Sequence, residues 1–337
     1  MNAANHPGSL LPVNIITGFL GSGKTTLLRY LLEDPDFENT AVLINEFGEV
    51  GLDHLIAREV SEDVLLLDSG CLCCSAGEDL GSTLLELLDL RRSGEAEFDR
   101  VVIETSGLAD PGPIVRLLMT DPGLGRHFRM GQVVAAVDGI NGAETIGAYP
   151  EAQQQIGMSD AVLITKVDLI PEERLAALQG VVRTMNPMVE LIDRSGLKTF
   201  FSGTVPSDRR PTVTDAHDHH HHHDHAHTAD VISFVVTIAE DVNLKRFIRW
   251  LELLLTARGK SILRVKGLLA VAGEERPRVV QAVQTIVFPL DSLGCWPDAD
   301  RRTRLVFIGK DITAAAIERS LRKHAILGEG VQRMETA

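Results

Sequence analysis

The chain has 337 residues, of which 44% are hydrophobic and only 4% are aromatic, and its formal net charge at pH 7 is -14. This length exceeds what one hydrophobic core usually fills, so we expect two domains packed mainly by aliphatic side chains. The 33 basic residues are outnumbered by 47 acidic ones. This balance argues against nucleic acid as the main partner and suits a protein that handles cations.

The amino-terminal residues have neither the charged nor the apolar segment of a signal peptide. No run of the sequence approaches the roughly 18 apolar residues that span a membrane. We therefore expect a cytoplasmic protein without membrane contact. Because cytosolic thiols are kept reduced, the clustered cysteines Cys71, Cys73 and Cys74 are expected to act as metal ligands rather than to form disulfides, whereas Cys295 is expected to be a packed or isolated thiol.

The first motif in chain order is a glycine-rich loop. An apolar strand is predicted at 13–16 and a helix at 26–32, and residues 18–25 between them match the Walker A spacing. Glycines suit this loop because its backbone N–H groups must approach phosphate oxygens closely, beside the partial positive charge of a helix N-terminus. We expect Lys24 to reach the terminal phosphates and Thr25 to bind Mg²⁺. The predicted phosphate-binding residues are Gly18, Gly21, Ser22, Gly23, Lys24, Thr25 and Thr26.

Three cysteines follow the predicted strand 63–67. Cys71, Cys73 and Cys74 lie on the loop after it, where function concentrates in open α/β sheets. Thiolates select soft or borderline ions, which favours Zn²⁺ over Mg²⁺ and leaves Co²⁺ open. A structural zinc site normally has four protein ligands, so Glu46 or Glu49 is a candidate for completing the shell, and Glu46 is the one that we predict. Structural or redox-active thiols are the alternative.

The next strand is predicted to end in an acidic residue. The apolar run 101–103 reads as a buried parallel strand that ends at Glu104, with Gly107 three positions later. Since this is the place of the Walker B carboxylate, we expect Glu104 to contact Mg²⁺ through a water or to orient an attacking water. The alternative is a carboxylate that caps the next helix. Lys24 and Glu104 are the predicted catalytic residues, and Gly107 is expected to contact the nucleotide.

Base recognition is predicted at residues 165–168. They read Thr-Lys-Val-Asp after the apolar strand 161–164, and are similar to the guanine-recognition element of GTPases. Asp168 can accept hydrogen bonds from N1–H and the 2-amino group of guanine, whereas adenine offers no such donor pair. An ordinary solvated turn is the alternative for so short a motif, but the upstream Walker A loop favours guanine. We therefore expect GTP with Mg²⁺, contacted by Thr165, Lys166 and Asp168.

A histidine-rich tract separates the two halves of the chain. Residues 217–227 interleave His with Asp, within a segment at 204–230 that we expect to be a disordered linker. Imidazoles in such number do not pack a core and can bind Zn²⁺, Co²⁺ or Ni²⁺. Metal capture or buffering is the expected role, and a solvated linker with incidental metal binding is the alternative.

The strand and helix signals predict one domain on each side of this linker. Residues 1–203 predict a mostly parallel α/β sheet covered by helices on both faces. Its strands are expected near 12–17, 40–45, 63–68, 99–104, 131–137 and 160–165. Residues 231–330 predict a smaller α+β domain. Its strands are expected at 231–236, 261–271, 279–288 and 303–309, with a helix at 244–255.

Taken together, the motifs resemble those of the CobW-type GTPases. The matching segments of the first half are 18–25, 45–50, 71–74, 104–107 and 165–168. The second half resembles the CobW C-terminal domain at 263–267, at Phe288 ahead of Trp296, and at 305–309. The resemblance implies a P-loop NTPase domain followed by a CobW-type α+β domain. It also implies kinship with the nickel-insertion GTPases of urease and hydrogenase, in a group whose members deliver zinc or cobalt to client proteins.

From these motifs we expect a GTP-hydrolysing metallochaperone that binds Zn²⁺ at the Cys-x-Cys-Cys site and transfers it to a client metalloprotein. GTP binding and hydrolysis would gate the transfer, and turnover would be slow alone because no arginine finger can be assigned. A cobalt-delivering protein of cobalamin synthesis shares these motifs, and a non-catalytic zinc buffer is a third hypothesis. The sequence leaves the client and a homo-oligomeric state open.

Overall fold

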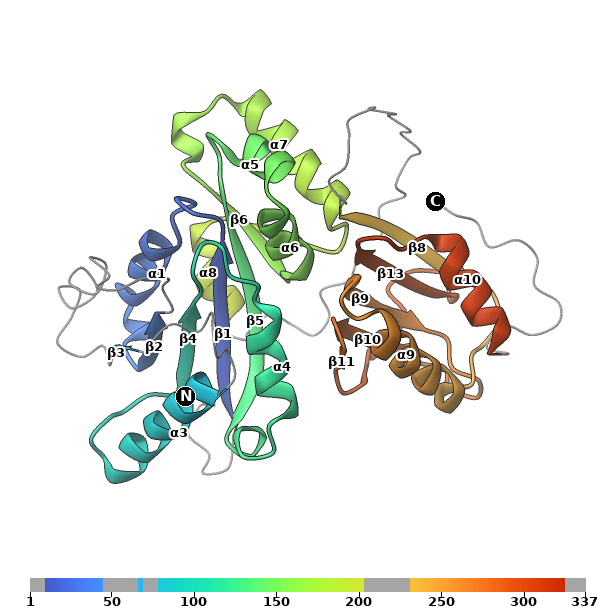
Figure 1. Cartoon of the computed structure of the whole chain (residues 1–337), viewed down its shortest axis with the longest axis horizontal. Coiled ribbons are helices and arrows are strands. Elements are labelled where there is room, and N and C mark those ends of the chain that lie inside the picture. The colour runs from blue at the N-terminus through green and yellow to red at the C-terminus, as the bar shows by residue number, and fades with distance from the viewer. Residues whose placement is uncertain (1–9, 45–65, 69–77, 203–230, 325–337) are drawn as a thin grey trace. The chain divides into compact units, whose positions relative to one another are not determined.

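The computed structural model describes residues 10–44, 66–68, 78–202 and 231–324 (Figure 1). The chain divides into two compact units. The first comprises residues 1–178 and 190–204, and the second comprises residues 179–189 and 205–337. None of the described helices has the length and apolar content that crossing a bilayer requires.

The first unit is built on a parallel sheet of seven strands in the order β3-β2-β4-β1-β5-β6-β7. The strands are β1 (Leu11–Gly18), β2 (Thr40–Ile44), β3 (Leu66–Asp68), β4 (Arg100–Glu104), β5 (Phe128–Asp138), β6 (Ala161–Thr165) and β7 (Glu190–Ile192). Strand β1 lies between β4 and β5, so the chain builds outward from it in both directions. Ligands of open α/β sheets bind outside the carboxyl ends of the strands at such a reversal point.

The strands are buried because their sequences are nearly continuous apolar runs. Ile15 and Ile16 point to opposite faces of β1, and both have no exposed surface, as is also true of Val101, Val102 and Ile103 in β4. Helices therefore cover both faces of the sheet, as predicted. The helices of this unit are α1 (Lys24–Leu32), α3 (Glu78–Ser93), α4 (Gly112–Thr120), α5 (Gly142–Ala148), α6 (Pro150–Met158) and α8 (Arg194–Phe201). Helix α7 (Glu172–Met185) begins in this unit, and its residues after Leu178 belong to the second unit. Short 3₁₀ turns are η1 (Pro35–Phe37), η2 (Leu124–Arg126) and η3 (Val167–Leu169).

The second unit contains an antiparallel sheet in the order β11-β10-β9-β13-β8, with β12 paired to β10. The strands are β8 (Ile232–Ile238), β9 (Ile262–Leu269), β10 (Arg278–Val283), β11 (Ile286–Val287), β12 (Asp291–Ser292) and β13 (Thr303–Gly309). Helices α9 (Leu244–Arg258) and α10 (Ala314–Lys323) contribute Trp250 and Leu321 to its core. The prediction of a parallel α/β fold followed by a smaller α+β fold is confirmed.

Four strands or helices differ from the prediction, and one of them is β12, a strand of two residues that was not predicted. The single strand expected at 279–288 is wrong, because Gln284 has a φ of 49° and the chain turns back, pairing Val283 with Ile286. Strand β7 was not predicted, since it has only three residues, all half-buried, at the edge of the sheet. Helix α10 was not predicted either, although Thr313 caps it by accepting a hydrogen bond from the N–H of Ala316.

Candidate functional site

The Walker A loop joins β1 to α1 and depends on glycine at its turns. Gly18, Gly21 and Gly23 have φ values of 141°, 71° and 89°, which L side chains rarely adopt. At Gly18 a Cβ atom would also lie 2.3 Å from the carbonyl oxygen of Ala136 in β5. Only glycine allows this tight passage from the strand into the loop, which ends where Gly23 serves as the N-cap of α1.

Lys24 begins α1 and is directed back over the loop. Its Nζ atom donates hydrogen bonds to the carbonyl oxygens of Gly18 at 2.9 Å and Phe19 at 3.1 Å, and the residue is only 8% exposed. The ammonium group and the N-terminal end of the helix thus concentrate positive charge at the loop. This arrangement can hold an anion such as a phosphate group.

The predicted Mg²⁺ ligand and the predicted Walker B carboxylate meet beside this loop. The hydroxyl of Thr25 donates a hydrogen bond of 2.7 Å to Oε1 of Glu104. The contact arises because β1 and β4 are neighbours in register, with Ile16 opposite Glu104. A hydroxyl and a carboxylate side by side form an oxygen donor set that fits Mg²⁺.

The alternative role of Glu104 as a helix cap is wrong. Helix α4 begins at Gly112, and the N–H of Gly112 donates instead to Asp110 at 2.8 Å. Glu104 is 5% exposed and directed toward Thr25 rather than toward α4. Glu104, at the end of a central strand, therefore contacts the helix that follows the Walker A loop and does not cap α4.

The segment after Glu104 is packed directly on the Walker A loop. The N–H of Thr105 donates to the carbonyl of Ile16 at 2.9 Å, and its hydroxyl donates to the hydroxyl of Thr17 at the same distance. A Cβ atom on Gly107 would lie 2.7 Å from the backbone nitrogen of Leu20. Glycine at this position is what allows the two backbones to approach.

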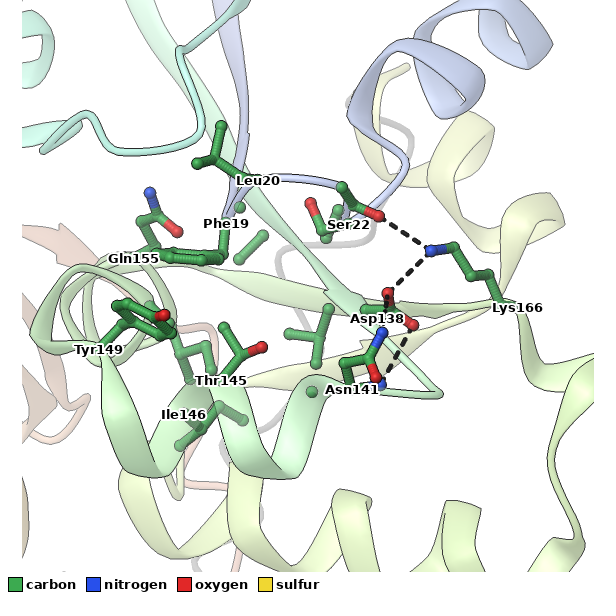
Figure 2. Close-up of a pocket in the computed structure, with 18 residues that line it drawn as sticks. Phe19, Leu20, Ser22, Asp138, Asn141, Thr145, Ile146, Tyr149, Gln155 and Lys166 are labelled. Carbon is green, nitrogen blue, oxygen red and sulfur yellow. Dashed lines mark hydrogen bonds and ion pairs between the residues drawn. The ribbon is translucent and has the colours of Figure 1, made fainter.

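The predicted base-recognition element is tied to the same loop. The hydroxyl of Thr165 donates to the carbonyl of Ser22 at 2.8 Å. Lys166 has a left-handed backbone, with φ of 54°, and its Nζ donates to the carbonyl of Gly21 at 3.0 Å. Figure 2 shows the Lys166 ammonium between the loop and Asp138. These hydrogen bonds join the Walker A loop to the end of β6, although the two segments are far apart in the sequence.

Asp138 is a site residue that the sequence did not single out. It ends β5, and its Oδ2 accepts a hydrogen bond from Lys166 at 2.8 Å, while its Oδ1 accepts one from the N–H of Ile140 at 2.8 Å. Burial by itself would raise the pKa of Asp138, but these hydrogen bonds outweigh it and hold the pKa below the ordinary value. Its place as an acidic residue at the end of a central strand was the available signal.

The remaining predicted nucleotide contacts are accessible. Thr26 is exposed on the first turn of α1, and Asp168 is exposed in η3, immediately beyond the anchored Thr165 and Lys166. An exposed carboxylate at this position can accept hydrogen bonds from a base that lies over the end of the sheet. All predicted nucleotide residues therefore belong to the loop, its helix or the strand ends beside it.

A cavity of about 380 Å³ lies on the side of the loop that faces α5 and α6 (Figure 2). Phe19 and Tyr149 form one wall, with ring centroids 4.5 Å apart and planes inclined by 32°. Ile146 adds apolar surface, and Gln155 and Asp138 add polar groups. This cavity was not predicted, because its walls come from segments about 120 residues apart in the chain.

The predicted zinc ligands Cys71, Cys73, Cys74 and Glu46, and the histidine tract 217–227, lie outside the described residues. The flanking strand ends are described: Ile44 is in register with both Asp68 and Glu104. Within the described residues, no group of three or more His, Cys, Asp or Glu side chains is arranged to hold a metal ion.

Comparison with known proteins gives two family matches. The model described as CobW/HypB/UreG, nucleotide-binding domain, matches residues 12–193, and the model described as Cobalamin synthesis protein cobW C-terminal domain matches residues 231–325. Together they cover most of the chain.

The chain is 34% identical to zinc chaperone YjiA of Escherichia coli (strain K12), over 89% of this chain and 94% of YjiA. It is 32% identical to zinc chaperone CobW of Pseudomonas aeruginosa, over 93% of this chain and 91% of that protein. Among solved structures, the Zn(II)-bound YjiA GTPase from E. coli is similar with a TM-score of 0.70 and 30% identity, over 94% of this chain and 99% of that chain. The protein is a member of the CobW-type P-loop GTPase family.

Proposed function

We propose that this protein is a GTP-hydrolysing metallochaperone that binds Zn²⁺ through Cys71, Cys73 and Cys74 and transfers it to a client metalloprotein. The observation that carries the proposal is the 2.7 Å contact between Thr25 and Glu104 beside the Lys24 ammonium. This contact joins a phosphate-binding loop to a carboxylate at one sheet edge, which is the arrangement that nucleotide hydrolysis requires.

Each of these residues has a distinct task in hydrolysis. Mg²⁺, when bound, would supply charge neutralisation on the terminal phosphates and would be held by Thr25, with Glu104 beside it. Lys24 exchanges its hydrogen bonds with the loop carbonyls for bonds to phosphate oxygens. Glu104 would hold an attacking water through its buried carboxylate or, with Thr25, would help to hold Mg²⁺ through a water. Asp168 selects guanine through its exposed carboxylate.

The register of the sheet supports a link between the nucleotide and the zinc ligands. Ile44, Asp68 and Glu104 are aligned at one edge of the sheet. The chain reaches Glu46 two residues after Ile44, and Cys71 three residues after Asp68. The segment with Glu46 therefore starts one strand away from the carboxylate that faces Thr25, and the segment with the cysteines starts two strands away, at the same end of the sheet. Zn²⁺ as cargo is favoured by the thiolate ligands and by the zinc chaperones to which the chain is similar.

The proposal is tested by Zn²⁺ titration of the full chain against a competing chelator, with either GDP or a non-hydrolysable GTP analogue bound. We expect the Zn²⁺ affinity to differ between the two nucleotide states by about 5-fold or more, a typical coupling between sites. Equal affinities would show that GTP does not gate metal binding. A parallel Co²⁺ titration compares the two candidate metals.

A Lys24→Ala variant separates a chaperone from a buffer. Loss of an ammonium that stabilises transition-state charge costs about 100-fold or more in kcat. We therefore expect this variant to keep its zinc sites but to lose GTP turnover. A wild-type protein that releases no phosphate in the presence of Zn²⁺ and a client would instead support zinc storage.

A further inference from the structure

A buried glutamine of α6 holds the segment that follows Glu104. Gln155 is 1% exposed, and its Nε2 donates one hydrogen bond to the carbonyl of Gly107 at 3.2 Å and another to the carbonyl of Ala109 at 3.1 Å. Because both partners are acceptors, only the amide nitrogen can face them, and both of its hydrogens are used. The orientation of this side chain is therefore determined by its contacts.

The two carbonyl groups belong to one tight turn. The N–H of Ala109 donates to the carbonyl of Ser106 at 3.0 Å, which closes a turn over residues 106–109. On its other side this turn touches the Walker A loop, where Gly107 approaches the backbone of Leu20. The turn is thus held between Gln155 and the loop, and it begins two residues after Glu104, the carboxylate that faces Thr25.

The other atom of the Gln155 amide faces a different environment. Its Oε1 is buried and has no hydrogen-bond partner within the part of the chain that the structure describes. Gln155 also lines the cavity beside the loop, as do Phe19 and Leu20 (Figure 2). A buried acceptor without a partner is unfavourable, so the contribution of this glutamine lies in its two donated bonds.

We propose that Gln155 is a positioning residue for GTP hydrolysis. Its amide holds the turn 106–109 against the Walker A loop, so that the turn and Glu104 meet the γ-phosphate in a fixed geometry. The inference rests on the proposed GTPase function. In this role Gln155 acts through its hydrogen bonds to the carbonyls of Gly107 and Ala109.

The effect should be specific for GTP. GDP lacks the γ-phosphate, which is the group that orders the equivalent segments of GTPases through direct contacts. In the wild type, Gln155 already holds the turn 106–109, so GTP binding does not have to order it. Without Gln155, part of the free energy of GTP binding is spent on ordering the turn. Loss of the anchor therefore weakens GTP binding and slows hydrolysis while GDP binding is retained.

The experiment compares the full-length wild type with Gln155→Leu, which removes both donors at similar volume, and Gln155→Glu, which places an acceptor against the two carbonyls. Two lost hydrogen bonds correspond to a factor of about 10, so we expect kcat to fall about 10-fold. Affinity for a fluorescent non-hydrolysable GTP analogue should fall about 5-fold, and GDP affinity should stay within about 2-fold.

Gln153→Leu is the matched control. Gln153 lies on the same helix, is also buried, and donates through Nε2 to the carbonyl of Ile146 at 3.0 Å, in α5 rather than in the turn. We expect this variant to lose thermal stability but to keep the wild-type ratio of GTP to GDP affinity. If Gln155→Leu weakens both nucleotides equally, or if Gln153→Leu changes the ratio as much, the role is structural and the inference is wrong.

The outcome also separates this inference from the proposed function. A wild type that binds GTP but does not hydrolyse it would contradict the GTPase proposal, while the affinity ratio still measures the anchor. A wild type that hydrolyses GTP with unchanged kinetics in both Gln155 variants would leave the GTPase in place and exclude the anchor. Circular dichroism of each variant establishes that it is folded, and Gln155→Glu replaces Gln155→Leu if the latter is not.

Discussion

Glycine at position 107 is required by contact, whereas glycine at position 18 is required by both contact and backbone conformation. The φ of Gly18 is 141°, and a Cβ atom there would clash with Ala136. Gly107 has no such φ, but a Cβ atom there would lie within 2.6–2.8 Å of three atoms of Leu20, two of them in the backbone. At the scale of single residues, the site is built from close approaches that a methyl group would prevent.

Gly107→Ala should therefore displace the turn 106–109 from the Walker A loop. We expect kcat/KM for GTP to fall about 10-fold, since a shift of this kind removes about 1–2 kcal/mol of transition-state stabilisation. Steady-state phosphate release measures this. Gly147→Ala in α5, where a Cβ atom would meet nothing within 4 Å, is the control and should keep wild-type kinetics. Normal turnover in Gly107→Ala would contradict the contact argument.

Glu104→Gln tests the carboxylate itself. Its amide oxygen can still accept the hydrogen bond from Thr25, but the negative charge beside the Mg²⁺ position is lost. We expect kcat for GTP to decrease about 100-fold, the typical contribution of an acid–base group, with GDP affinity little changed. The matched control is Glu144→Gln on the exposed first turn of α5. A Glu104→Gln variant with full activity would remove Glu104 from the catalytic residues.

At the scale of elements, the ends of β5 and β6 brace the loop that follows β1. Thr165 and Lys166 bind carbonyls of the loop, and Asp138 holds the Lys166 ammonium from the other side. The left-handed backbone of Lys166 is strained for a side chain of this kind. Such strain is accepted where several contacts fix the residue, as they do here.

Asp138→Asn should show a pH-dependent loss of stability. The pKa of Asp138 in the folded protein lies below its unfolded value of 3.8, so its carboxylate stabilises the fold above about pH 3.8. This stabilisation is lost as the pH falls through the lower, folded pKa. Because Lys166 is 36% exposed, solvent screening limits the difference at pH 7 to about 1 kcal/mol.

Urea unfolding of wild type and Asp138→Asn between pH 7 and pH 3 measures this difference, which should shrink toward acid pH. Asp89→Asn, in the exposed pair with Arg92, is the control and should show little difference at any pH. A constant difference between wild type and Asp138→Asn would mean that packing, not ionisation, is the origin of the effect.

The strands that were predicted wrongly or not at all are those whose bounds depend on pairing with other strands rather than on the hydrophobic pattern of their own sequence. Residues 279–288 were expected to form one strand, yet the chain reverses at Gln284, and β10 pairs with β11 across this turn and with β9 on its other side. Strand β7 is too short to show a period. By contrast, β13 (Thr303–Gly309) matches its predicted bounds because an uninterrupted apolar run fills a central position between β8 and β9.

At the scale of the whole molecule, the chain has two units with separate cores. The aliphatic core of the first surrounds β1, while the second is packed around Trp250, Phe247 and Phe307. Trp250 is 1% exposed, and its Nε1 donates to the hydroxyl of Ser320 at 3.0 Å, which joins α9 to α10. None of the nucleotide-site residues discussed above belongs to the second core.

Trp250→Ala should therefore destabilise the second unit and spare the nucleotide site. We expect a loss of about 3–5 kcal/mol in the free energy of unfolding of that unit, as for other buried aromatic residues. GDP affinity should stay within about 2-fold of wild type. Denaturant unfolding followed by circular dichroism, alongside fluorescent GDP binding, measures both. A parallel loss of GDP affinity would mean that the two units depend on each other for folding.

The sequence by itself determined the Walker A loop, the buried strands and the family, whereas the guanine-recognition role of residues 165–168 stays a prediction. These features are local, since each can be recognised from about 10 consecutive residues of the sequence. They are a glycine-rich loop, an apolar run long enough for a buried strand, and the start of a helix. The same local signals led to Lys24, Thr25 and Glu104, each of which the structure places at one edge of the sheet.

Only the tertiary structure decided how these motifs act on one another. The strand order puts Glu104 beside β1 and Asp138 beside Thr165, although 34 residues separate the two carboxylates in sequence. The hydrogen bond from Gln155 to the carbonyl of Gly107 joins residues 48 positions apart, and no periodic pattern in the sequence indicates it. Contacts of this kind depend on which strands pair and on how closely two backbones approach. Neither property can be predicted from a local pattern of side chains.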